Sequence, residues 1–291
     1  MMAASGDTSE VWRPKKWHAL LRRHNIRPDK RLGQNFLLDP ASLNRILGVV
    51  DLEQWPVVLE IGAGVGSLTR TLARQAQRVV AVEFDRRLLP ALQEAIADLD
   101  GVELVFGDFL DLRLADLMGD SPYAVAANIP YNITSAVIRK LLEAPNPPGQ
   151  IVLTVQREVA ERIVAGPGDM SLLALSVQLY GTPSIEARLP ASVFYPSPKV
   201  DSAVLRIEFR SDAVHDSDQI ETVFDLARAG FGQRRKQLRN SLEHGLPLDR
   251  EQVSELLGEV GIDPKRRPQS LSIAEWKRLA TTYSQRKMDG A

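Results

Sequence analysis

The stretch VVLEIGAGVGSLT, residues 57–69, joins a short apolar run to a glycine-rich turn and then to the start of a helical pattern. Glycines allow the chain to turn tightly and let a ligand come close to the backbone. Turns of this composition after a first strand serve NAD, FAD and S-adenosylmethionine alike. The stretch therefore predicts the first strand, turn and helix of an α/β domain that binds a nucleotide-like cofactor. The alternative is a sharp turn that binds nothing.

Apolar runs like the one at 57–61 recur along the chain. Their hydrophobicity is continuous rather than alternating, which is typical of strands buried on both faces of a parallel sheet. The spacers at 67–75 and 86–98 have helical patterns and the length of βαβ crossovers. We therefore expect a doubly wound, Rossmann-like α/β fold. The seven expected strands are 57–61, 79–83, 102–106, 123–127, 151–155, 184–189 and 202–209.

Changes in pattern divide the chain into three parts. Residues 1–30 are expected to form a tail and a short amphipathic helix, and residues 31–211 the α/β domain. The composition turns polar at 211–217, and beyond this point no strand pattern appears. Residues 212–291 are therefore expected to form a small all-α domain. Its expected helices are 218–230, 233–243, 249–259 and 273–284.

Composition excludes several classes of chemistry. The chain has no cysteine, so disulfides, thiolate metal sites and cysteine nucleophiles are ruled out. Its four histidines are scattered without metal-ligand spacing, and we expect no metal. No apolar stretch is long enough to cross a bilayer, and the N-terminus lacks the apolar core of a secretion signal. A cytoplasmic protein without a membrane partner is expected.

Positive charge is concentrated in two segments, although the net charge is only −1. Residues 11–36 carry eight lysines and arginines against the single acid Asp29, and residues 228–239 carry five against none. Such clusters on a neutral chain favour a polyanionic partner held at defined places, and the alternative is solvated helix faces. The candidates for contact with a nucleic acid in the second segment are Arg234, Arg235, Lys236 and Arg239.

Polar side chains follow the second and third expected strands. Glu83 ends the second strand, where a carboxylate can accept hydrogen bonds from both ribose hydroxyls. Asp108 follows the third strand and can accept one from an adenine amino group, and Phe109 can cover the ring. Taken alone, Asp108 is equally consistent with a helix cap or an Asx turn. Three successive strand ends together indicate an adenosine-containing cofactor.

The fourth strand ends in Asn128-Ile129-Pro130-Tyr131, which favours S-adenosylmethionine over NAD. A dehydrogenase needs an acid or base beside the hydride, and no histidine occurs between His24 and His215. An exocyclic adenine nitrogen is a poor nucleophile because its lone pair is delocalised into the ring. The Asn128 side-chain oxygen and a backbone carbonyl held by Pro130 would favour a tetrahedral nitrogen with a localised lone pair. Tyr131 offers a face for base stacking, and the alternative is a proline-stiffened turn.

The chain resembles the ribosomal RNA adenine N6-dimethyltransferases, and most closely their bacterial small-subunit branch, which is linked to kasugamycin sensitivity. The resemblance runs from residue 31 to about 280, nearly the whole chain. Four of its motifs, those at 31–39, 194–203, 233–242 and 267–272, are far more specific than the glycine-rich turn. The matching stretches are RLGQNFLLD (31–39), VLEIGAGVG (58–66), NIPYN (128–132), FYPSPKVDSA (194–203), QRRKQLRNSL (233–242) and RPQSLS (267–272).

This resemblance implies a Rossmann-like methyltransferase domain with a small C-terminal helical domain that recognises RNA. The implied enzyme dimethylates N6 of two adjacent adenosines in a hairpin loop near the 3′ end of 16S rRNA. It would act as a monomer on the 30S subunit or its precursor during ribosome biogenesis, and release S-adenosylhomocysteine. The implied roles are cofactor binding by Asn35, Leu37, Gly62, Glu83, Asp108 and Asn128, catalysis by Asn128, Pro130 and Tyr131, and stacking of the flipped base between Tyr131 and Phe194.

Two other functions remain open on the sequence. A 23S rRNA adenine dimethyltransferase of the macrolide-resistance type would share the cofactor turn and the Asn-x-Pro-Tyr chemistry, and the segments 233–242 and 267–272 favour the small-subunit type. A ribosome-assembly or transcription factor without turnover is the non-enzymatic alternative. The presence of Asn128, Glu83 and Asp108 argues against it. The departures from the family pattern are modest. Ile129 stands where relatives often have Leu, but only its backbone carbonyl is expected to matter; Tyr195 stands at a tolerant position; and Lys30-Arg31 is a shorter basic run than in some relatives.

Overall fold

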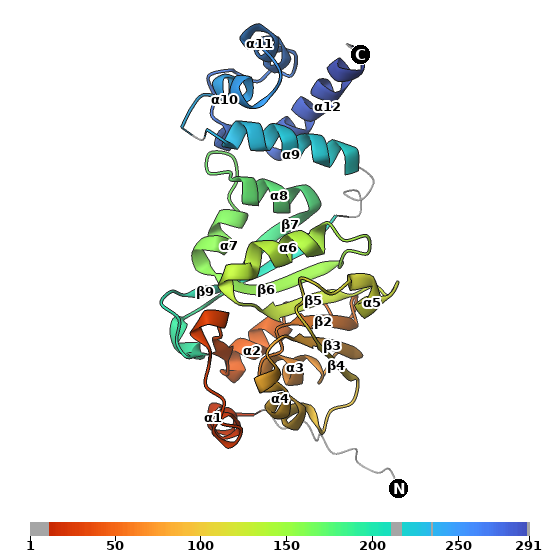
Figure 1. Cartoon of the computed structure of the whole chain (residues 1–291), viewed down its shortest axis with the longest axis vertical. Helices are drawn as coiled ribbons and strands as arrows, with labels where there is room; N and C mark the ends of the chain where they lie inside the picture. Colours follow the sequence, from red (N-terminus) through yellow and green to blue (C-terminus); the bar gives the residue numbers. More distant parts are fainter. Residues whose placement is uncertain (1–11, 211–216, 234, 290–291) are drawn as a thin grey trace. The chain divides into compact units, whose positions relative to one another are not determined.

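The computed structural model describes residues 12–210, 217–233 and 235–289 (Figure 1). The chain divides into two compact units, each with its own core. The first unit takes Met1–Ala160 and Ser184–Phe209, and the second takes Glu161–Pro183 and Arg210–Ala291. Residues 161–183 therefore group with the C-terminal helices, whereas the sequence placed them in the α/β domain. The reason is burial, because Met170, Ala174, Leu175 and Leu179 share one apolar cluster with those helices.

The sheet confirms the expected Rossmann-like class. Its seven strands lie in the order β4-β3-β2-β5-β6-β9-β7. The pairs β2–β3, β3–β4, β2–β5 and β5–β6 are parallel, and β6–β9 is antiparallel. All seven strands coincide with the expected apolar runs, with bounds that differ by a few residues. These strands are β2 (Val57–Ile61), β3 (Arg78–Glu83), β4 (Val102–Phe106), β5 (Ala124–Asn128), β6 (Gln150–Gln156), β7 (Gly181–Leu189) and β9 (Ser202–Phe209).

The central strands are buried on both faces, as their continuous apolar runs predict. Val58, Val80, Ala126 and Val152 are all fully buried. The chain runs outward from β2 to β3 and β4 in one direction and from β5 to β6 in the other, so the strand order reverses between β2 and β5. In open α/β sheets the ligand crevice lies at the carboxyl ends of the strands at this switch point.

The helices of the first unit are mostly short. α3 and α4 are the crossovers expected after β2 and β3, although each is shorter than its pattern suggested. α5, α6 and α7 were not assigned from the sequence. The bounds are α1 (Pro14–Arg23), α2 (Pro40–Leu47), α3 (Ser67–Leu72), α4 (Leu89–Ile96), α5 (Leu114–Met118), α6 (Thr134–Leu142) and α7 (Arg157–Ile163), the last ending in the second unit, with 3-10 turns η1 (Lys30–Leu32), η2 (Arg86–Leu88), η3 (Tyr131–Ile133) and η4 (Ala191–Val193).

The segment after α1, to which no element was assigned from the sequence, contains short regular elements. It contains the two-residue strand β1 (Phe36–Leu37), which pairs antiparallel with β8 (Phe194–Tyr195). A pairing of two residues is too short to leave a period in the sequence, which is why it was not predicted. Phe36 also packs with Trp17 and Leu20 of α1 in one apolar cluster. Strand pairing and apolar packing thus hold the N-terminal segment against the rest of the first unit.

The second unit is helical, as expected. Leu226, Leu242 and Trp276 are fully buried in its core. The helix expected at 233–243 begins only at Leu238. Ahead of it, the Lys236 N–H donates to the Gln233 carbonyl at 2.8 Å. The helices of this unit are α8 (Leu172–Tyr180), α9 (Ser217–Phe231), α10 (Leu238–Gly245), α11 (Arg250–Glu259) and α12 (Ile273–Asp289), with the 3-10 turn η6 (Pro268–Ser270).

Among the residues that the structure describes, no helix is both long enough and apolar enough to cross a membrane.

Candidate functional site

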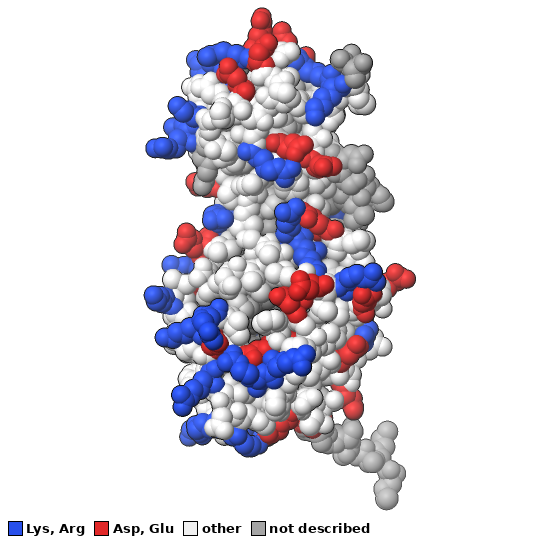
Figure 2. All heavy atoms as spheres, in the orientation of Figure 1, with Lys and Arg blue, Asp and Glu red and all other residues white. Residues whose placement is uncertain are grey.

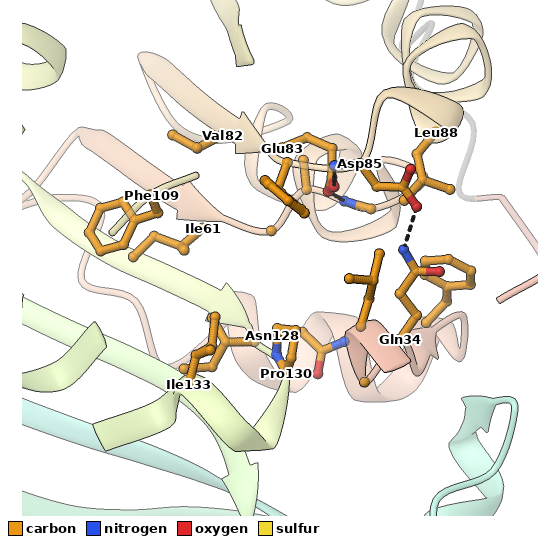
Figure 3. Close-up of a pocket in the computed structure, with 18 of the residues that line it drawn as sticks. Gln34, Ile61, Val82, Glu83, Asp85, Leu88, Phe109, Asn128, Pro130 and Ile133 are labelled. Carbon is orange, nitrogen blue, oxygen red and sulfur yellow. Dashed lines mark hydrogen bonds between the residues drawn. The ribbon is translucent and has the colours of Figure 1, made fainter. Parts of the chain in front are cut away.

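A cavity of about 260 Å³ opens at the carboxyl ends of β2, β3, β4 and β5 in the first unit (Figure 3). The N-terminal segment from Arg31 to Leu37 forms its remaining wall. Figure 3 shows Glu83 and Asn128 on opposite sides of this space, with Phe109 at one end. Phe194, predicted to stack on the substrate base, does not line the cavity. All the residues that the sequence predicted for cofactor binding and catalysis do line it: Asn35, Leu37, Gly62, Glu83, Asp108, Asn128, Pro130 and Tyr131.

The glycine-rich turn presents bare backbone to the cavity. Gly62 has φ +77°, and a Cβ added there would meet nothing within 4 Å. Gly64 has φ +60°, and a Cβ there would lie 3.3 Å from the Phe36 ring. Both backbone conformations favour glycine. The space beside Gly62 is thus left open by the chain itself, and a ligand can approach the backbone there.

Glu83 lies at the end of β3 with its carboxylate held by backbone. It accepts hydrogen bonds from the N–H groups of Gly64 and Asp85, both at 2.7 Å. Burial raises the pKa of Glu83, and the two backbone donors oppose that rise. The bond to Gly64 joins the end of β3 to the glycine-rich turn after β2, so the carboxylate is positioned before any ligand arrives.

Glu60 is a residue of this site that sequence reasoning did not select. It lies in β2, is only 1% exposed, and lines the cavity. Its Oε2 has no hydrogen-bond partner among the described residues. Burial raises the pKa of Glu60 to about 8, and the nearby Glu83 carboxylate acts in the same direction. The signal available in the sequence was a lone acid inside an apolar strand.

The loop after β4 carries Asp108 and Phe109 into the cavity wall. The Asp108 Oδ1 accepts a hydrogen bond from the Leu110 N–H at 2.9 Å, which is the Asx turn that the sequence left open. Asp108 also lines the cavity, so the same side chain both closes a local turn and can contact a ligand. Lys140 on α6 secures this loop, because its Nζ donates to the Leu110 carbonyl at 2.7 Å and also to that of Leu112.

Phe84 is the second residue that the sequence did not single out. It follows Glu83 directly, lines the cavity, and is 54% exposed. Phe109, by contrast, is only 4% exposed. An exposed aromatic ring at the edge of this cavity offers a face to a planar ligand.

Asn128 is oriented by the N-terminal segment. Its Nδ2 donates to the Asn35 carbonyl at 3.0 Å. Its Oδ1 takes no hydrogen bond from any residue that the structure describes. The donor end of the amide is therefore occupied, and the acceptor end is free for a ligand that carries N–H groups. Gln34 anchors the same segment, since its Nε2 donates to Asp85 Oδ2 at 2.8 Å (Figure 3).

Tyr131 is held by a hydrogen bond between its hydroxyl and Ser202 Oγ, at 2.7 Å. Burial raises the pKa of this phenol, so it stays neutral near pH 7. Phe194, expected to face Tyr131 across a base, does not line the cavity. It is 4% exposed and packs in an apolar cluster with Leu37 and Leu189. The pairing of β8 with β1 turns the Phe194 side chain into that cluster and leaves the next residue, Tyr195, 42% exposed.

The predicted RNA contacts belong to the second unit. Arg235 and Lys236 are exposed in the turn before α10, and Arg239 on α10 is half-buried. Arg234 lies outside the described residues. No cluster of three or more histidine, aspartate or glutamate side chains able to hold a metal occurs in the described parts of the chain.

Comparison with known families agrees with this geometry. The model for the family described as "Ribosomal RNA adenine dimethylase" matches residues 24–284, which include every residue that lines the cavity. The chain belongs to this family. It is therefore an rRNA adenine methyltransferase, with the Rossmann-like fold of methyltransferases that use S-adenosylmethionine.

Individual relatives match most of the chain. The ribosomal RNA small subunit methyltransferase A of Dehalococcoides mccartyi strain CBDB1 is 42% identical over 266 residues, which are 91% of each chain. The protein of the same name from Clostridioides difficile strain 630 is 38% identical and covers 90% of this chain and 92% of its own.

Solved structures of the family share the fold. The 23S rRNA methyltransferase ErmE superposes with a TM-score of 0.70 at 29% identity, covering 86% of this chain and 100% of its own. A dimethyladenosine transferase from Plasmodium falciparum gives a TM-score of 0.73 at 23% identity, covering 86% of this chain and 97% of its own.

Proposed function

We propose that this chain transfers methyl groups from S-adenosylmethionine to N6 of two adjacent adenosines near the 3′ end of 16S rRNA, within the small ribosomal subunit or its precursor. The relatives named small subunit methyltransferase A support the choice of RNA. The observation that carries the chemistry is the state of the Asn128 amide in the cavity wall: its Nδ2 donates to the Asn35 carbonyl, and its Oδ1 accepts no hydrogen bond from a described residue.

The residues of the cavity fit the proposed cofactor. The open space beside Gly62 accepts a methionine portion, Glu83 accepts the ribose hydroxyls, and Asp108 accepts the adenine amino group. Phe84 offers a face to the adenine ring. The unpaired Oε2 of Glu60 fits a cationic ligand in the same cavity, because a buried acid gains most from a nearby positive charge. When bound, the cofactor supplies a methyl group already activated by its sulfonium.

The chain then has to make an adenine amino group nucleophilic. In our proposal Asn128 Oδ1 accepts one N6 hydrogen and the Ile129 carbonyl, held by Pro130, accepts the other. Two acceptors placed in this way favour a tetrahedral nitrogen, and the electrostatic arrangement exists before the substrate arrives. No strong general base is required, since the lone pair attacks and the proton leaves afterwards to an acceptor or to water.

The base must leave its stack to reach these acceptors. Tyr131, fixed by Ser202, supplies a rigid face against which it can lie. Phe194 reaches the same base only after its ring leaves the apolar cluster around Leu37. In the second unit, Arg235 and Lys236 supply exposed positive charge for RNA phosphates. Arg239 is half-buried and therefore contributes less to this exposed charge.

The experiment is methylation of isolated 30S particles and of 23S rRNA fragments side by side, followed by mass mapping of N6-dimethyladenosine. Dimethylation of two adjacent adenosines in 16S rRNA is expected. A 23S product would identify the second candidate function, which is the one named for ErmE, whose fold this chain shares. Cofactor binding without transfer to either RNA would instead indicate a factor that has lost turnover.

A further inference from the structure

Among the described residues, Tyr195 is one of the few large hydrophobic side chains that are exposed, at 42%. It pairs in register with Phe36 of β1, which lines the cavity. The exposed ring therefore belongs to the strand next to β1, which forms part of the cavity wall. Nothing described so far for the reaction uses it.

The segment that carries Tyr195 is anchored to the site at both ends. Before it, Phe194 pairs with the cavity residue Leu37. After it, Ser202 bonds to the hydroxyl of Tyr131. The intervening residues, including Lys199, are largely exposed. Tyr195 thus stands at a fixed place beside the mouth of the cavity.

Helix α1 brings further side chains to this ring. The His18 ring meets that of Tyr195 edge to face, with centroids 4.6 Å apart and planes at 90°. Lys15 and Arg22 precede and follow His18 by three and four positions, so the three share one face of α1. Lys15 and Arg22 are exposed, and neither forms an ion pair with a described residue, whereas the neighbouring Arg23 is paired with Glu94. Figure 2 shows lysine and arginine side chains gathered over the part of the first unit that carries α1.

We propose that Tyr195, His18, Lys15 and Arg22 form a subsite for the unpaired nucleotide next to the target adenosine. The base stacks on the free face of Tyr195, which His18 buttresses from its edge, and the adjoining phosphates contact Lys15 and Arg22. Aromatic faces interleaved with positive charge are what proteins use for single-stranded nucleic acid. An acidic protein segment would use the two charges but would have no need of the exposed ring. The inference rests on the proposed function, since the nucleotide belongs to the same RNA.

The first test compares Tyr195→Ala with Tyr195→Phe in the full chain, using 30S particles and S-adenosylmethionine. Loss of one stacked base should raise the KM for particles about tenfold. Phenylalanine keeps the stacking face and should restore the KM to within about twofold of wild type. The Kd for S-adenosylmethionine, measured by calorimetry, should stay the same in both variants, which a general loss of structure would not allow.

The second test removes charge with Lys15→Gln and Arg22→Gln together. The matched control is Arg113→Gln with Arg139→Gln, two exposed arginines of the same unit that lie beside α5 and on α6, away from α1 in Figure 1. Loss of two phosphate contacts should lower the salt slope of particle binding by about 1.4. The control pair should leave that slope unchanged.

The outcomes separate this inference from the function on which it rests. Wild-type protein that fails to methylate particles overturns the proposed function itself. Active wild type with an unchanged KM in Tyr195→Ala overturns the subsite. A reduced salt slope without any effect of Tyr195→Ala overturns it too, because that result indicates a purely charged partner such as an acidic protein surface.

Discussion

Glu60 should make the first unit less stable as the pH rises. A buried carboxyl with a pKa of about 8 is neutral in the folded chain near pH 7, whereas in the unfolded chain it ionises with the ordinary value of 4.5. The unfolded state therefore gains stability from ionisation as the pH increases past 4.5, and the folded state does not until about pH 8. Glu60→Gln removes this dependence because an amide cannot ionise.

The size of the effect follows from those two pKa values. At 1.36 kcal/mol for each unit, the interval from 4.5 to about 8 corresponds to roughly 5 kcal/mol. The free energy of unfolding of Glu60→Gln minus that of wild type should therefore grow by about 1.4 kcal/mol for each pH unit between pH 5 and pH 8. It should level off above that range.

Urea unfolding at a series of pH values measures this difference. Trp12, Trp17 and Trp55 lie in the first unit with Glu60, and Trp276 lies in the second. A shared Trp276→Phe background therefore leaves tryptophan fluorescence to report on the unit that contains the mutation.

The matched control is Glu53→Gln, which removes the charge of an exposed glutamate of the same unit. We expect this control to differ from its parent by no more than about 0.5 kcal/mol throughout. A Glu60→Gln difference that stays constant from pH 5 to pH 8 would refute the reasoning, because Glu60 would then titrate alike in the folded and unfolded chains.

Four further predictions concern the reaction and its partners. Asn128→Ala should lower the rate of methyl transfer about 10²- to 10³-fold while circular dichroism stays unchanged, and near-normal turnover would contradict its role as acceptor. Glu83→Ala should weaken S-adenosylmethionine binding in calorimetry more than it weakens particle binding; equal losses would count against the ribose contact. Arg235→Gln with Lys236→Gln should lower the salt slope of particle binding by about 1.4 to 1.8 without changing cofactor affinity, and an unchanged slope would mean that these charges meet no phosphate. Lys140→Met should raise the Kd for S-adenosylmethionine about tenfold by freeing the loop of Asp108, with partial recovery in Lys140→Arg, and an unaltered Kd would show that the loop holds its shape without this lysine.

Much of the architecture follows from local sequence. Strands such as 57–61 and 151–155 are continuous apolar runs, and only a sheet covered on both faces buries such runs completely. Parallel strands also bring their carboxyl ends to one edge, so Glu83, Asp108 and Asn128 had to meet once the strands were assigned. The places of Asn35 and Leu37 in the cavity wall were expected only from the family resemblance, because the segment around them has no period of its own.

Local pattern was less informative for the C-terminal helices. The expected helix at 233–243 begins with good helix formers, yet the observed helix starts only at Leu238. Its first residues bond elsewhere, since the Leu238 N–H donates to the Arg266 carbonyl at 2.7 Å. Residues 161–183 likewise join the second unit because their apolar side chains pack there. Helix propensity is a weak preference that tertiary contacts override.

The sequence by itself thus determined the fold class, the end of the sheet at which the cofactor is expected to bind, and the residue types that meet there. Tertiary structure alone decided how those residues act. Asn128 presents its oxygen because the carbonyl of Asn35, 93 residues away, takes its N–H. Phe194 is buried and Tyr195 exposed because a two-residue strand pairs with β1. Orientation and burial depend on partners distant in the chain, and no local pattern records which partner a side chain will find.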